Sequence, residues 1–263
     1  MLVTAAHCVD ANFNGENPNL MIHVYANTGS GNFGGNPTWS TNDLTVHPSW
    51  GGSGAVGSGF DIAVIRVARE DNQTEIIKMA TIEEYNQLTR CDFFTVFGTG
   101  TTNTGEGTSE QLLKTDDLQW MDCYGAHMQN FAHYQNGNIQ GNYYLVPGFD
   151  HALCMNATVE YQENGYSAIC QGDSGGPLVH KDKLFGVVSY NYPPCNGGMP
   201  NVFASVAHFL ENGWLNDNTD YDDSADFWCY ENCDEHSCDN TTPVQETTSM
   251  PGTTVRSCIS GRC

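Results

Sequence analysis

The segment with the clearest chemical potential is CQGDSGGP at residues 170–177, in which Ser174 stands among three glycines. Gly172, Gly175 and Gly176 leave the hydroxyl open to an approaching carbonyl carbon and permit a tight turn that aims N–H groups inward. A serine hydroxyl is a weak nucleophile unless a neighbouring base, itself oriented by a third group, activates it. The alternative interpretation is a glycine-rich turn with an incidental serine.

A histidine and a carboxylate that could serve Ser174 occur earlier in the chain. His7 follows a short apolar segment in TAAHC, and Asp61 opens the β-branched run FDIAVIRV. That run predicts a buried strand over 60–67, where a lone carboxylate is costly unless it is hydrogen-bonded. From the run alone, Asp61 is either a strand-edge residue in water or a buried acid with a dedicated partner. His7 is either a base or a satisfied core histidine.

Short strands and turns are expected to position these residues. Apolar or alternating runs predict strands at 20–25, 44–48, 60–67, 91–97, 112–121, 184–190 and 202–206. Residues 207–215 predict an amphipathic helix, because Phe209, Leu210 and Trp214 recur at helical spacing. Residues 124–151 predict a long surface insertion.

The composition predicts a secreted chain. Eleven cysteines in 263 residues indicate disulfides in an oxidising compartment. Sequons at Asn72, Asn156 and Asn240 agree with glycosylation. A net charge of −22 argues against nucleic acid or an anionic membrane as a partner. The apolar stretch at Met1 is too short for a signal peptide, so we expect the sequence to begin inside a domain.

Beyond residue 216 the composition changes. Residues 217–263 are acidic, rich in Thr and Pro, and hold five cysteines, which predicts a small appendage stapled by bridges. A zinc site that uses these cysteines and His236 is a weaker alternative.

Taken in order, the contexts of His7, Asp61 and Ser174 resemble those of the chymotrypsin-like (trypsin-like) serine peptidases. Further matches are the segments HPSW at 47–50 and LC at 153–154. The resemblance covers residues 1–216, the expected peptidase domain. It implies an all-β fold of two six-stranded antiparallel barrels with a C-terminal helix, the first barrel lacking its opening strands.

The resemblance also implies a role for each residue. Ser174 attacks the peptide carbonyl, His7 takes and returns the proton, and Asp61 fixes the tautomer of His7. The N–H groups of Gly172 and Ser174 form the oxyanion hole, and Ser189 supports Asp61 by a hydrogen bond. No cofactor or metal is implied.

The substrate pocket departs from the trypsin pattern. Its floor is Ala168 instead of an aspartate, so a buried lysine or arginine of the substrate would have no counter-ion. By the resemblance, Asn191 and Asn201 occupy wall positions that are small in open pockets, and Ser189 and Tyr190 lie on the strand that borders the substrate. We therefore expect an uncharged, small to medium P1 residue.

The family pairing implies two disulfides, Cys123–Cys154 and Cys170–Cys195. Cys8 and Cys91 depart from that pairing: the usual partner of Cys8 would lie upstream of Met1, and His180 occupies the position of the usual partner of Cys91. We expect Cys91 to bond to the tail or to sequence outside this chain.

These residues together predict a secreted, monomeric serine endopeptidase that acts on proteins or peptides and is open to protein inhibitors. Family members are made as zymogens, and a newly freed N-terminal ammonium pairs with the aspartate before the nucleophile, here Asp173. Because Met1 lies close to His7, we expect the activation segment to be missing from this sequence. The alternatives are an inactive family member that binds other proteins, and a chain whose tail is a targeting module.

Overall fold

A computed structural model of the chain describes residues 1–10, 21–25, 36–52, 58–67, 76–102, 107–128, 151–157, 168–191, 195, 199–219 and 221. The chain divides into two units, Met1–Asp220 and Tyr221–Cys263. The predicted appendage beyond residue 219, apart from Tyr221, and most of the predicted insertion at 124–151 lie outside the described residues. All the described helices and strands belong to the first unit.

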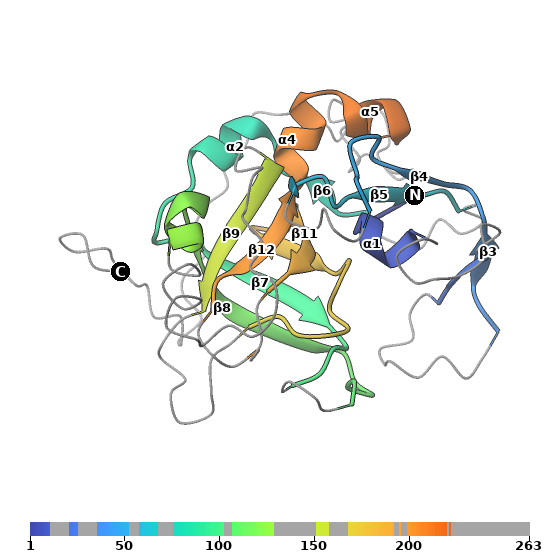
Figure 1. Cartoon of the computed structure of the whole chain (residues 1–263), viewed down its shortest axis with the longest axis horizontal. Coiled ribbons are helices and arrows are strands. Elements are labelled where there is room, and N and C mark those ends of the chain that lie inside the picture. The colour runs from blue at the N-terminus through green and yellow to red at the C-terminus, as the bar shows by residue number, and fades with distance from the viewer. Residues whose placement is uncertain are drawn as a thin grey trace, which may run out of the picture. The chain divides into compact units, whose positions relative to one another are not determined.

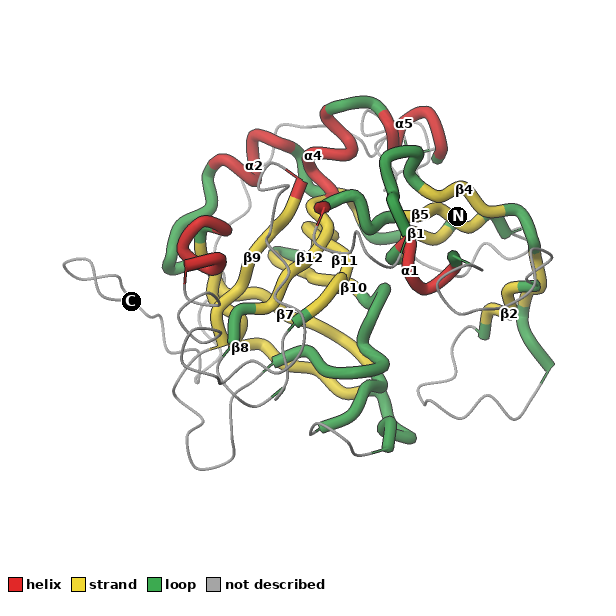
Figure 2. Tube along the Cα trace, in the orientation of Figure 1, coloured by secondary structure: helices red, strands yellow, loops and turns green. Residues whose placement is uncertain are grey.

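Six antiparallel strands form a closed barrel (Figures 1 and 2). In spatial order they are β7 (Phe93–Gly98), β8 (Leu113–Met121), β9 (Ala152–Ala157), β12 (Asn201–Ser205), β11 (Lys183–Tyr190) and β10 (Pro177–His180). β10 pairs with both β11 and β7, which closes the ring. The short β6 (Lys78–Met79) adds to β11 in parallel.

The barrel core follows from the two-residue period of its strands. Along β7, Phe94 and Val96 are buried while Phe93 and Thr95 are partly exposed, because successive side chains of a strand point to opposite faces. Phe94 and Val96 meet buried residues of the other strands, including Phe203 of β12.

The N-terminal part of the unit forms two smaller sheets. β1 (Leu2–Thr4), β5 (Ala63–Ile65) and β4 (Leu44–Val46) make a three-stranded antiparallel sheet with β5 in the middle. β2 (Ile22–Val24) and β3 (Trp39–Thr41) pair as a ribbon. A single helical turn, α1 (Ala6–Val9), follows β1 directly and buries Ala6 and Val9 against this sheet.

The helices of the described residues are short. α2 (Ile82–Asn86) begins with a capping box in which Thr81 and Glu84 bond each other's backbone. The helix predicted over 207–215 is wrong in its continuity: the chain forms α4 (Val206–Glu211) and α5 (Trp214–Asn218). Gly213 lies between them at a φ of 84°, a left-handed conformation that ends a helix.

The all-β prediction is confirmed. The predicted strands appear as β2, β4, β5, β7, β8, β11 and β12, with ends shifted by at most three residues. Periodicity did not predict β1, β3, β6, β9 and β10, although the family resemblance marked residues 153–154 of β9. All but β9 have only two to four residues, and a short apolar run carries little periodic signal.

Candidate active site

His7 is delivered by α1, which turns the chain immediately after β1. Its backbone N–H donates to Asp61 Oδ1 over 2.9 Å, and its ring Nδ1 lies 2.7 Å from Asp61 Oδ2. Two contacts from one residue to one carboxylate fix both the helical turn and the plane of the ring. Since a carboxylate accepts, Nδ1 carries the proton and Nε2 is left as the basic nitrogen.

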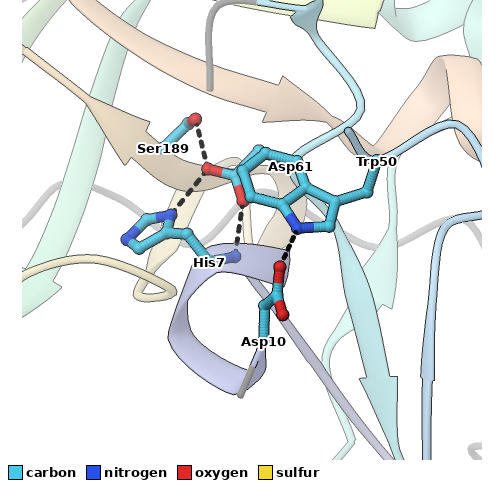
Figure 3. A network of polar contacts seen from close by, with 5 residues as sticks. All are labelled: His7, Asp10, Trp50, Asp61 and Ser189. Atoms are coloured by element: carbon cyan, nitrogen blue, oxygen red, sulfur yellow. Dashed lines mark hydrogen bonds and ion pairs between the residues drawn. The ribbon is translucent and has the colours of Figure 1, made fainter. Parts of the chain in front are cut away.

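Asp61 is a buried acid with dedicated partners, the second of the two alternatives that the sequence leaves open. Its side chain is 1% exposed, and Ser189 of β11 donates a third hydrogen bond of 2.6 Å to Oδ2 (Figure 3). Asp61 precedes β5, whereas Ser189 belongs to the closed barrel, so the carboxylate joins the two halves of the unit.

The pKa of His7 rises above its usual 6.5. Burial by itself lowers this pKa, but the hydrogen bond and negative charge of Asp61 oppose it and prevail, with a smaller contribution from Cys8. The pair therefore favours the imidazolium form, the form that a base takes once it has accepted a proton.

The Ser174 loop is tied to β11 and packed against the segment that carries His7. Gly175 donates to Val188 of β11 over 2.9 Å, and Val188 donates back to Gly176 over 2.9 Å. Gly175 has a φ of 78°, and a β-carbon on it would overlap the Thr4 hydroxyl and lie 3.3 Å from Cys8 Sγ, so only glycine fits there. The serine loop and α1 are thus in contact. The Ser174 side chain itself makes no hydrogen bond to another described residue.

Several N–H groups of this loop have no acceptor. The N–H groups of Asp173, Gly175 and Gly176 all donate to backbone carbonyls, whereas those of Gln171, Gly172 and Ser174 bond no acceptor among the described residues. Gly172 has a φ of 95°, which other residues rarely adopt. Of these donors, Gly172 and Ser174 are the pair that the family resemblance assigns to the oxyanion hole.

Asp173 is held by the backbone, which sequence reasoning did not foresee. Its Oδ1 accepts from the Gly100 N–H and its Oδ2 from the Cys170 N–H, each over 2.8 Å. Burial raises the pKa of Asp173, and these two hydrogen bonds only partly oppose the rise. A β-carbon at Gly98, the last residue of β7, or at Gly100 would overlap this carboxylate, so these two glycines form its cradle.

The expected pocket wall is bridged by two amide side chains. Asn201, fully buried at the start of β12, accepts from the Ile169 N–H over 3.1 Å, and Asn191 Nδ2 donates to the Ile169 carbonyl. Ala168 is half-buried beside them. The ring of Tyr190 packs against the buried cluster that includes Val202.

The structure contains the two disulfides implied by the family pairing, Cys123–Cys154 and Cys170–Cys195. Cys8 is a free, half-buried thiol. Cys91 is also disulfide-bonded. His180 stacks on Phe94 with ring centroids 4.7 Å apart.

The described part of the chain shows neither a metal site nor a membrane-spanning helix. No three His, Cys, Asp or Glu side chains gather there in a way that could hold a metal ion. No helix in those residues is long and apolar enough to cross a membrane.

Comparison with known proteins agrees with this geometry. A family model described as Trypsin matches residues 1–212. A trypsin-like protease of Streptomyces glaucescens is 29% identical, over 81% of this chain and 69% of its own length. Trypsin epsilon of Drosophila erecta is 30% identical, over 82% of this chain and 72% of its own.

Among solved structures, HL collagenase matches with a TM-score of 0.58 and 23% identity, covering 84% of this chain and 82% of its own. An inactivated protease paralogue of the scabies mite, S-D1, matches with a TM-score of 0.59 and 22% identity, covering 82% of each chain. These likenesses confirm the chymotrypsin-like two-barrel fold. From the family model and the relatives, the chain belongs to the trypsin family of serine proteases.

Proposed function

We propose that this chain is a serine endopeptidase that cleaves peptide bonds through an acyl-enzyme on Ser174. The observation that carries the proposal is the buried Asp61 carboxylate, which accepts from His7 Nδ1 and Ser189 and so makes His7 Nε2 the basic nitrogen. Buried carboxylates are expensive, and one aimed at a histidine beside a glycine-flanked serine serves proton transfer.

In the proposed reaction the Ser174 oxygen attacks the peptide carbonyl carbon while His7 Nε2 takes the hydroxyl proton. The resulting tetrahedral species collapses, and His7 gives that proton to the departing amine. A water molecule then attacks the acyl-enzyme by the same route and frees Ser174. Asp61 keeps the His7 ring in one tautomer and stabilises its charged form throughout.

The oxyanion of each tetrahedral species would accept from the N–H groups of Gly172 and Ser174. Their lack of other acceptors in the described residues supports this role, because such donors can bond the oxyanion without breaking another hydrogen bond. Loss of one such donor typically costs about 3 kcal/mol of transition-state stabilisation. The hydrogen bonds of Asp173 to the backbone stabilise the turn that carries these two N–H donors.

An active-site label tests the proposal directly. A fluorophosphonate probe should label the wild-type chain and leave Ser174→Ala unlabelled, and the wild type alone should cleave a mixed peptide library. Because one structural relative is described as inactivated, the fold by itself does not decide activity. A folded wild-type chain that neither labels nor cleaves would refute the proposal.

We further propose that the enzyme prefers an uncharged P1 residue of small to medium size. Asn191 and Asn201 bond the backbone of Ile169 next to Ala168, so amide groups take up space at the pocket wall. Ala168 offers no charge to a cationic side chain. Substrates that differ only at P1 should be cleaved fastest after Ala, Ser or Val, and fast cleavage after Lys or Arg would contradict this assignment.

We also propose that the protein is secreted. Two disulfides in the described residues fit an oxidising compartment. Expression in a secretory host, with and without residues 217–263, would show whether the catalytic domain folds and acts as a monomer without its tail. Adding protein inhibitors of trypsin-like enzymes to the secreted enzyme and measuring its remaining activity would show whether they bind it.

A further inference from the structure

The helical turn that carries His7 is tethered at both ends. At its start, the His7 N–H bonds the Asp61 carboxylate. At its end, Asp10 receives the indole N–H of Trp50 on Oδ2 over 2.8 Å, which Figure 3 shows beside the His7–Asp61 pair. The Asp10 backbone N–H in turn closes the turn on the Ala6 carbonyl over 2.9 Å.

The Trp50–Asp10 hydrogen bond is connected through the backbone to the His7–Asp61 pair. Trp50 donates its backbone N–H to the His47 carbonyl over 2.9 Å, and His47 donates its own to the Ile62 carbonyl over 3.1 Å. Ile62 is the residue after Asp61. Residues 47–50 therefore form a bracket that begins next to Asp61 and ends on α1.

α1 needs such a bracket. It has four residues and no side-chain cap at its start, and so short a helix has little stability of its own. Trp50 also packs its ring against the buried cluster that holds Ala6 and Val9, so packing and hydrogen bond act on the same turn.

We propose that Asp10 and Trp50 are positioning residues that set the orientation of the His7 ring through the indole hydrogen bond. This rests on the proposed function, in which His7 is the base. Asp10 and Trp50 do not touch the reacting atoms. They fix the end of α1 so that Nδ1 of His7 meets Asp61, which leaves Nε2 as the nitrogen that can act as the base.

Trp50→Phe and Asp10→Ala remove the donor and the acceptor separately. Each should lower kcat at least 10-fold with KM changed less than 2-fold, and the double variant should be no worse than the poorer single variant. Asp10→Asn keeps an oxygen that accepts the indole N–H, so it should retain at least half of the wild-type kcat. Trp120→Phe is the matched control: its indole nitrogen is buried without a hydrogen-bond partner in the described residues, so kcat should stay unchanged.

A second readout does not need activity. NMR titration of the His7 ring, assigned with His7→Ala, should give a lower midpoint in Trp50→Phe than in the wild type, because a misoriented ring bonds Asp61 less well. Midpoints that agree within 0.1 pH unit, or an Asp10→Asn variant as impaired as Asp10→Ala, would overturn the proposal. If the wild type is inactive, the proposed function fails while the titration still decides whether the bracket holds His7.

Discussion

Replacing Asp61 by Asn tests the core of the site, because an amide cannot accept at both of its ends. If its oxygen takes the place of Oδ2, the hydrogen bonds from His7 Nδ1 and Ser189 survive and the one from the His7 backbone is lost. In the opposite orientation, the amide NH₂ faces two donors and both bonds are lost. Each bond to a charged group is worth about 1.5–3 kcal/mol.

One to two lost bonds correspond to a decrease of about 10- to 10⁴-fold in kcat/KM. The loss of the countercharge to the imidazolium puts the expected value near the upper end. The pH profile adds a qualitative signature. In the wild type, kcat/KM should rise with pH about a midpoint above 6.5, since the pKa of His7 is raised. In Asp61→Asn the charge of Asp61 no longer opposes the effect of burial, which leaves the smaller contribution of Cys8 and any surviving hydrogen bond, so the midpoint should fall below the wild-type value.

The assay is a chromogenic peptide with a small P1 residue, followed from pH 5 to pH 10, with circular dichroism to show that each variant is folded. Ser189→Ala is the control: it removes one hydrogen bond but keeps the charge, so the midpoint should not fall. A folded Asp61→Asn variant with at least one third of wild-type kcat/KM would refute the reasoning.

A group whose pKa is raised on folding stabilises the protein below its unfolded pKa. The contribution of His7 should therefore be complete below pH 6.5 and disappear as the pH rises through its folded pKa.

Three other substitutions separate pocket, loop and scaffold. Asn201→Gly removes an amide from the pocket wall, and kcat/KM for Phe relative to Ala at P1 should rise about 10-fold or more; an unchanged ratio would mean that this side chain does not limit the pocket. Gly98→Ala places a methyl group on the Asp173 carboxylate and should lower kcat about 100-fold, the cost of losing an aligned oxyanion donor. A normal kcat in a folded variant would show that activity does not depend on the backbone contacts of Asp173. Thr81→Ala breaks the capping box with Glu84 and should lower the free energy of unfolding by about 1 kcal/mol in urea titrations, with kcat unaffected.

Much of the candidate site could be predicted from the sequence. The glycines around Ser174, the β-branched run after Asp61 and the alternation along residues 91–97 each reflect a local requirement, and local requirements are visible in residue order. Short strands such as β10 were missed because their pairing, not their composition, makes them strands. The break between α4 and α5 was missed because a single glycine inside a periodic pattern is a weak signal.

Other features depend on residues that are distant in the chain. Whether Asp61 was an exposed edge residue or a buried acid could not be decided until Ser189, 128 residues later, was seen to donate to it. The backbone partners of Asp173 lie in the loop after β7 and at Cys170, and no sequence pattern marks an N–H group as able to bond a carboxylate.

By itself, the sequence determined which residues are chemically able to act: a serine among glycines, a histidine after an apolar segment and a carboxylate before a buried strand. Residue type and local backbone freedom are properties of short segments, so they can be recognised without a structure. The tertiary structure decided which nitrogen of His7 faces Asp61, which N–H groups of the serine loop bond other backbone groups and how Trp50 reaches Asp10. Such contacts join segments that only folding brings together, and hydrogen bonding falls off within a few tenths of an ångström.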